Sequence, residues 1–455
     1  MLIIYLIILI LISNEMNGKQ IIGHFDQLKN QIIKLEGYHG FNTYTIDSVH
    51  IDDNGNFLLS YNENNIGIGY LINNENKPFI LILSGEDIEL KGESLSKSGG
   101  ISIVKGADNI LFDQYINEQV QRNKMINSLN NIEHSYINEK LFNKHNEGLM
   151  CIQNEKEKLL LEATDGINSI PSDSFLNWYI KTRLLINSIY VLHDNDSLKK
   201  YHTIDLLRNI NYADERLYTS GLLKELIDGH LWALSNYTKS KDLMIHEIKM
   251  SIDTLISQLS TKGYDTSSVI PYLFILFEKQ SLFELSEYLY NQLTNHSNII
   301  INNDLHTILE SYKAMINGNK APNIIFGNHS YFPENIVIKN LYDIKSSYKL
   351  IIFAASWCEH CLKEIPYMAQ FYKQWKKLDL ETIMISLDET PIDFANFAAG
   401  LPFISSCDYL KWNSIPVKDY FVYGTPSMFL LNKSNQIISR PTSVDQITKY
   451  LESKQ

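Results

Sequence analysis

Two cysteines, Cys358 and Cys361, have the residue type and the spacing for redox chemistry in this sequence of 455 residues. An apolar run at residues 350–355 leads into them and predicts a strand that is buried on both faces. Apolar residues at helical spacing over 362–377 predict a helix directly behind them. Cys358 is therefore expected at a helix N-terminus, where free backbone N–H groups and the helix dipole favour an anion such as a thiolate. A stabilised thiolate beside a second thiol is what thiol–disulfide exchange requires.

The elements that must position this pair form a recognisable order in the last third of the chain. A strand at 349–355 is followed by the helix at 362–377, a second strand at 381–387 and a helix near 393–399. A hairpin of 427–431 with 436–440 and a terminal helix from Ser443 complete the pattern. Strand, helix, strand, hairpin and helix in this order predict a thioredoxin fold over residues 321–455.

The chain before this domain changes character twice. Residues 19–107 contain short alternating strands with Gly and Asn turns, which predict a small β-sandwich or barrel. Residues 108–320 have helical periodicity and predict an all-α domain of about six to nine helices. The fold class expected is therefore multidomain α+β, with a linker near 317–322. Asp53-Asn54-Gly55 is interpreted as a hairpin turn rather than a calcium loop, because the later ligand positions are missing.

The N-terminal residues indicate export. Residues 1–12 are almost wholly apolar, and a run of about 12 is too short for a bilayer span of about 20 residues. Such a run is typical of a signal peptide, expected here over 1–18, although no Lys or Arg precedes it and no clean cleavage site follows it. A buried strand or a wrongly chosen start codon is the alternative. Export would place the cysteine pair in an oxidising compartment, the periplasm or cell envelope.

Composition limits the possible partners. The formal net charge is −12 and Lys and Arg form no cluster, which argues against nucleic-acid binding and gives no reason to expect attraction to anionic membranes. Four cysteines in 455 residues are too few for a disulfide scaffold. Among the histidines of the helical region, His193, His202, His230 and His246, no pair has the HExxH form, so a metal site is not expected.

Three motifs together resemble one family. Trp357 directly precedes the pair, Glu364 lies three residues after Cys361 with a proline two residues further, and Gly424-Thr425-Pro426 precedes a predicted strand. These features resemble the active-site segment and the cis-proline loop of TlpA/ResA-like exported thiol–disulfide oxidoreductases. The resemblance covers about residues 321–455. The β and helical regions look like the accessory regions of multidomain TlpA-like proteins of bacterial envelopes.

The sequence assigns each member of the pair a role. Cys358 is the expected nucleophile, and Cys361, one turn inside the helix, is the expected resolving thiol with which it forms a disulfide. His360 can offer a hydrogen bond or positive charge to the thiolate, whereas Glu359 opposes it. The hypothesis is a redox potential between that of thioredoxin, about −270 mV, and that of DsbA, about −120 mV.

The resemblance adds three further roles. It implies that Glu364 lies near the pair and assists proton transfer; a solvated helix glutamate is the alternative. It implies a cis bond before Pro426, which would leave the Thr425 backbone free to pair with a substrate chain as an added strand. Trp357 is expected to form an apolar wall beside the pair, and an ordinary core tryptophan is the alternative.

The two remaining cysteines have plainer expected roles. Cys407 could be a third redox thiol, but a buried structural cysteine is the favoured interpretation because no other cysteine lies near it in sequence. Cys151 is expected to be inert. A zinc site at Cys358 and Cys361 is not expected, since no second ligand pair stands at metal spacing. The thiol pair is its own redox group, so neither a dissociable cofactor nor a metal is implied.

The function expected is disulfide exchange with protein thiol or disulfide substrates. The resemblance implies a membrane electron donor, and the direction of electron flow stays open. One alternative is an envelope binding or scaffold protein whose thioredoxin fold is a docking module. Another is a peroxidase of the peroxiredoxin branch, but its Thr-x-x-Cys pattern is absent because Ser356-Trp357-Cys358 stands in that place.

Overall fold

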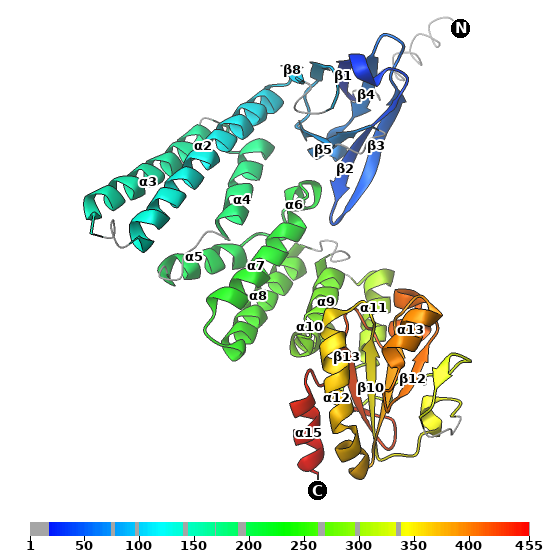
Figure 1. The fold of residues 1–455 in the computed structure, drawn as a ribbon. Helices are drawn as coiled ribbons and strands as arrows, with labels where there is room; N and C mark the ends of the chain where they lie inside the picture. Colours follow the sequence, from blue (N-terminus) through cyan, green and yellow to red (C-terminus); the bar gives the residue numbers. More distant parts are fainter. Residues whose placement is uncertain are drawn as a thin grey trace, which may run out of the picture. The chain divides into compact units, whose positions relative to one another are not determined.

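The computed structural model describes residues 18–73, 78–95, 100–139, 144–168, 170–189, 197–262, 269–295, 301–333 and 338–454 (Figure 1). Residues 1–17 of the expected signal peptide and His193 lie outside these ranges. Within these ranges no helix has both the length and the apolar character needed to cross a membrane. The chain divides into two compact units, Met1–Met244 and Ile245–Gln455.

The first unit begins with two four-stranded sheets. One has the order β4 (Asn56–Tyr61), β1 (Lys19–Phe25), β7 (Ile88–Gly92), β8 (Ser102–Lys105). The other has the order β3 (Asn42–His50), β2 (Ile32–His39), β5 (Gly67–Ile72), β6 (Phe79–Leu83). Neighbouring strands pair antiparallel, except that β1 and β7 are parallel. Ile21 and Leu90 of the first sheet and Leu35 and Leu81 of the second belong to one buried hydrophobic core.

The turn at Gly55 forms as predicted, but the hairpin expected around it is wrong. Gly55 has φ +90°, and the Asp52 carboxylate accepts hydrogen bonds from the N–H groups of Asn54 and Asn56. The strands on either side, β3 and β4, nevertheless belong to different sheets. A Cβ at position 55 would lie 2.9 Å from the Phe25 carbonyl oxygen, so this close approach to β1 also requires glycine.

Helices follow the sheets along the chain. They are α2 (Ala107–Asn138), α3 (Asn146–Asn168), α4 (Phe175–Ile189), α5 (Ser197–Arg208), α6 (Glu215–Thr219), α7 (Leu223–Tyr237) and α8 (Lys241–Lys262), which crosses the division between the units. The apolar stripe of α7, which includes Leu223, Leu226 and Ile227, is buried as its spacing predicts.

Three helices pack with the last domain in the second unit. They are α9 (Val269–Lys279), α10 (Phe283–Asn295) and α11 (Asn303–Lys313). Phe274 on α9 and Tyr312 on α11 lie with ring centroids 6.4 Å and 5.8 Å from that of Phe421 in the last domain. The buried Arg440 guanidinium binds the buried Glu278 carboxylate of α9 through both of its terminal nitrogens.

A six-stranded sheet forms the centre of the second unit. Its order is β14 (Ile437–Ser439), β13 (Ser427–Asn432), β10 (Tyr348–Ala354), β11 (Leu380–Ser386), β12 (Ile404–Cys407), β9 (Ser330–Tyr331). β10, β11 and β12 are parallel, and the other neighbours pair antiparallel. All but the first residue of β10 are buried, as expected for a central strand covered on both faces.

The helices of this domain are α12 (Glu359–Lys377), α13 (Pro391–Ala398), α14 (Ile415–Asp419) and α15 (Val444–Glu452). Short 3-10 helices occur at Asp26–Leu28, Glu63–Asn65, Leu341–Asp343 and Lys411–Asn413. The predicted order of strand, helix, strand, helix, hairpin and helix is confirmed (Figure 1). The helix α12 begins three residues earlier than its apolar spacing indicated, because Cys358 caps it.

Candidate active site

Cys358 and Cys361 form a disulfide at the start of α12. Their Cα atoms lie 5.2 Å apart. Cys358 is the N-cap residue, and its Sγ accepts a hydrogen bond from the backbone N–H of Cys361 over 3.1 Å. Cys358 is 8% exposed, whereas Cys361 is completely buried. The sulfur that can be reached from outside is therefore the one that faces the free N–H groups of a 19-residue helix.

The register of the sheet brings the proline loop to this disulfide. β13 begins at Ser427, which pairs with Phe353 near the end of β10. The preceding Thr425–Pro426 bond is cis. The Thr425 carbonyl oxygen lies 3.3 Å from Cys358 Sγ, although the two residues are 67 positions apart in sequence. The structure thus places Thr425 and Pro426, the two residues of the expected proline loop, beside the cysteine pair.

Trp357 lies at the surface next to the pair. Its side chain is 45% exposed, and its indole Nε1 donates to the Leu387 carbonyl over 3.4 Å. Its ring packs against Trp412 with centroids 5.9 Å apart, and the Lys411 ammonium lies 5.4 Å from its ring centroid. An exposed tryptophan fixed at one edge offers an apolar surface beside the sulfurs, which an ordinary core tryptophan would not.

The three other polar candidates face solvent to different degrees. Glu359 and His360 are exposed, and Glu364 is half-buried. In the described part of the chain, none of the three side chains forms a hydrogen bond or an ion pair within the protein. Glu364 thus lies on the same helix as Cys361, and no side-chain contact in the described residues fixes its carboxylate elsewhere.

A buried carboxylate that the sequence motifs did not reveal anchors the segment before the pair. Asp388 is completely buried. Its Oδ1 accepts from the backbone N–H and the hydroxyl of Ser356, over 3.0 Å and 2.7 Å, and its Oδ2 accepts from the Ser386 hydroxyl. The sequence did contain one indication that Asp388 lies near the cysteine pair. Asp388 follows β11, which is parallel to β10, and the carboxyl ends of parallel strands meet at one edge of a sheet.

Cys407 lies at the carboxyl end of β12 and is buried. Its Sγ lies 3.3 Å from the Asp388 carbonyl oxygen and accepts from the Tyr409 N–H over 3.4 Å. Burial raises the pKa of its thiol above the ordinary value of 9.0, and the charge of Asp388 adds to this effect. This environment supports a structural role for Cys407.

Metal ligands do not gather in the described residues, where no three His, Cys, Asp or Glu side chains are grouped so that they could hold an ion. A disulfide at a helix N-terminus, with its less buried sulfur beside a cis-proline loop, is an arrangement suited to exchanging one disulfide for another. Fold and site together define a thioredoxin-like thiol–disulfide oxidoreductase.

Comparison with known proteins leads to the same class. Residues 346–437 match a family model described as thioredoxin-like. The thiol-disulfide oxidoreductase ResA of Bacillus thuringiensis subsp. konkukian is 31% identical over 140 residues, which are 30% of this chain and 76% of that protein. The ResA of Bacillus subtilis is 26% identical over 137 residues, 29% of this chain and 71% of that protein. The chain belongs to the ResA-like family of thiol–disulfide oxidoreductases.

A solved structure with a similar domain is the thioredoxin domain of a thiol-disulfide oxidoreductase from Bacteroides vulgatus. It is 20% identical, with a TM-score of 0.27, and the match covers 30% of this chain and 97% of that one. These two ResA proteins and this domain each cover at most 30% of the chain.

Proposed function

We propose that this oxidoreductase exchanges disulfides with protein substrates, with Cys358 attacking and Cys361 resolving. The observation that carries the proposal is the position of Cys358 Sγ, which lies 3.1 Å from the Cys361 backbone nitrogen and 3.3 Å from the Thr425 carbonyl oxygen. The N–H stabilises a thiolate at this sulfur, and the carbonyl belongs to the loop where a substrate chain would pair.

The reductive direction is written for the dithiol form. The Cys358 thiolate attacks one sulfur of the substrate disulfide, the substrate S–S bond breaks, and its electron pair leaves on the other substrate sulfur, which takes up a proton. Cys361 then loses its proton and attacks the Cys358 sulfur, which forms the disulfide between them and releases the second substrate thiol. Two electrons pass from the pair to the substrate, and an external dithiol must return them.

Three polar side chains tune these steps in the proposal. Glu364 lies one helical turn beyond Cys361 and is half-buried, so it can accept the Cys361 proton before ring closure. His360 and Glu359 are exposed and act on the Cys358 thiolate with opposite signs. Because the effects of His360 and Glu359 oppose each other, the redox potential expected for the cysteine pair lies between about −270 mV and about −120 mV. A glutathione titration that gave a value below this window would reject the balance.

Substrate binding is assigned to the proline loop and to Trp357. Pro426 has no backbone N–H, so the loop beside the sulfurs presents the Thr425 backbone to an extended substrate chain. Trp357, 45% exposed, covers the apolar part of that chain.

The proposal includes the setting of the reaction. The apolar residues 1–12 support an exported protein of the periplasm or cell envelope, with a membrane dithiol as electron donor and no dissociable cofactor. Residues 19–107 would form a small β-sandwich, supported by two sheets that share one core. Residues 108–320 would form an all-α domain and 321–455 the catalytic domain.

Trapping tests the proposal directly. Cys361→Ser in the full chain should accumulate a mixed disulfide between Cys358 and substrate proteins, seen on non-reducing gels and lost on adding a dithiol, because the resolving thiol is gone. The wild type should reduce insulin with dithiothreitol as electron source. Cys407→Ser in the same background is the control and should trap equally well.

Failure would take distinct forms. A Cys361→Ser chain that traps nothing, in a protein that reduces no insulin, would contradict exchange and favour the scaffold alternative. Consumption of hydrogen peroxide faster than insulin disulfides would favour the peroxidase alternative.

A further inference from the structure

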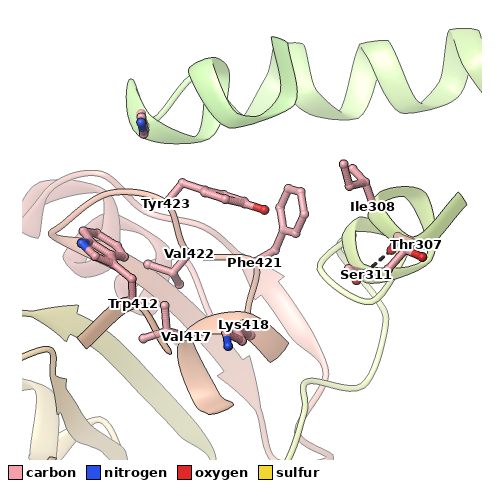
Figure 2. A pocket seen from close by; sticks show the side chains of 10 residues that line it. Thr307, Ile308, Ser311, Trp412, Val417, Lys418, Phe421, Val422 and Tyr423 are labelled. Carbon is pink, nitrogen blue, oxygen red and sulfur yellow. Dashed lines mark hydrogen bonds between the residues drawn. The ribbon is translucent and has the colours of Figure 1, made fainter. Parts of the chain in front are cut away.

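A cavity of about 570 Å³ lies next to the active site in the second unit. One wall comes from the catalytic domain and includes Trp412, Phe421 and Tyr423; the other includes Ile308 and Ser311 of α11. Figure 2 shows Ile308 on one side of this space and Phe421 and Tyr423 on the other. The volume is in the range of sites that bind small ligands or side chains.

Both ends of the catalytic-domain wall are continuous with the active site. Tyr423 stands two residues before Thr425, whose carbonyl lies 3.3 Å from Cys358 Sγ. Trp412 packs against Trp357, the residue before Cys358, with ring centroids 5.9 Å apart. A chain bound at the disulfide therefore has the cavity within reach.

The two walls are held together by packing and charge. The Phe421 ring contacts those of Phe274 and Tyr312, and the buried ion pair of Arg440 and Glu278 joins α9 to the catalytic domain. A Cβ at Gly424 would lie 3.2 Å from the Lys279 carbonyl oxygen, so the end of α9 lies close against the proline loop. The cavity is thus part of the packed unit.

The lining determines which side chain would enter. Phe421, Val422 and Val417 are buried and apolar, and Tyr423 is half-buried. Two exposed lysines, Lys279 and Lys418, also line the cavity. Neither lysine has an ion-pair partner in the described part of the chain. Such a surface favours a large apolar side chain with a carboxylate beside it.

We propose that this cavity selects protein substrates by a bulky apolar residue two positions from their reactive cysteine, followed by an acidic residue. The proposal rests on the exchange function and names the substrate class of that site. In an extended chain, residues two apart point to the same side, about 6.6 Å apart. Residues 424–426 bend, so the cavity is reached by distance rather than by strand register: a residue two positions from a cysteine held at Thr425 lies about 6.6 Å from it and can reach the surface that Tyr423 lines.

Symmetric disulfides of short peptides test this selection, because both sulfurs then have the same neighbours. One peptide has Phe two residues before and two residues after its cysteine, and Asp three residues before and three residues after it. The matched peptide has Ser in place of each Phe and Asn in place of each Asp. The full chain is reduced beforehand and mixed with each peptide without external reductant. The expected result is a second-order rate constant about tenfold larger for the Phe and Asp peptide, as apolar pockets discriminate by this order.

Variants of α11 connect the preference to the cavity. Ile308→Trp fills the space and should reduce the preference to about twofold or less. Glu310→Trp is the control, because Glu310 is exposed on the same helix and does not line the cavity. Thr307→Trp is a second filling variant from an exposed position, in case Ile308→Trp melts below the wild type. Lys418→Glu should lower the preference for the Phe and Asp peptide without abolishing it, because it reverses one of the two lysine charges and leaves the apolar lining unchanged.

The outcomes distinguish a failure of substrate selection from a failure of disulfide exchange. Equal rates with both peptides in the wild type, or a preference that the filled variants keep, would overturn the selection and leave exchange intact. No reduction of either peptide would remove the exchange function, and the selection with it.

Discussion

Two cysteines of the catalytic domain lie at or just beyond the carboxyl ends of parallel strands of the same sheet, yet only one of them begins a helix. Cys358 comes four residues after the end of β10 and begins the helix α12, where the Cys361 N–H donates to its sulfur. Cys407 ends β12 and lies buried against the Asp388 carbonyl oxygen. Each sulfur accepts from one backbone N–H and lies 3.3 Å from one carbonyl oxygen, so the difference between them is the helix that begins at Cys358 and the Asp388 charge near Cys407.

This difference teaches that position at a strand end does not by itself make a thiol reactive. A long helix follows Cys358 and supplies partial positive charge, which favours the thiolate. No helix begins at Cys407, and burial raises the pKa of its thiol. The structural element that follows each strand therefore separates the redox cysteine from the structural one.

Asp388 touches both regions. Its carboxylate binds the backbone N–H of Ser356, two residues before Cys358, while its main-chain carbonyl faces Cys407. The same residue thus anchors the segment before Cys358 and lies against the buried sulfur of Cys407.

The largest expected effect separates the two cysteines by activity. Cys358→Ser should lower the rate of insulin reduction by about a thousandfold or more, because no other thiolate stands at the helix start. Cys407→Ser should stay within about twofold of wild type, since that thiol takes no part. A loss with Cys407→Ser as large as that with Cys358→Ser, in a protein that still melts normally, would make Cys407 a redox thiol.

The second largest effect is expected in the alkylation rates of Cys358 and Cys407 in the reduced protein. Iodoacetamide at pH 7 should modify Cys358 about a hundredfold faster than Cys407, because a thiol with its pKa above 9.0 is about 1% or less ionised at that pH. The Cys407 rate should keep rising as the pH passes 9, since its proton leaves only above that value. Mass spectrometry after timed quenching reads both sites, and denaturant should bring Cys407 to the rate of the exposed Cys151.

Removing the Asp388 carboxylate should lower both the stability of the domain and the rate of disulfide exchange. Asp388→Asn keeps the size but loses the charged acceptor of the Ser356 N–H and hydroxyl, so unfolding free energy should fall by about 1–3 kcal/mol and exchange by several-fold. Denaturant titration and insulin reduction measure the two effects. Glu389→Gln is the control; its exposed ion pair with Lys411 is worth about 0–1 kcal/mol. Equal stability of the two variants would show that Asp388 is not an anchor.

The smallest expected effect concerns proton transfer. Glu364→Gln should slow exchange near neutral pH at least about threefold, because the half-buried carboxylate no longer accepts the Cys361 proton. The loss should shrink at high pH, where Cys361 ionises without help. Glu359→Gln, exposed beside the same pair, should not show this pH dependence. A Glu364→Gln profile parallel to that of wild type would reject the role.

Much of this domain could be predicted from local sequence. The buried run before Cys358, the helical spacing behind it and the Ser443 cap of α15 are signals that act within a few residues. The turn at Gly55 was predicted by the same kind of signal, but its strands entered different sheets. Strand partners depend on which apolar faces meet in the core, and a turn does not determine that.

The sequence by itself determined that a strand runs into a cysteine pair at the start of a helix, because hydrophobic periodicity and helix capping are local interactions. Only the tertiary structure decided what stands around the pair. Thr425 and Asp388 are 67 and 32 residues from their partners Cys358 and Ser356. Ile308 of α11 joins the neighbouring cavity from outside the predicted catalytic domain. The register of the central sheet and the packing of α9 and α11 bring these residues together. Residue spacing does not predict such long-range contacts, and the place of Thr425 was expected only from the family resemblance.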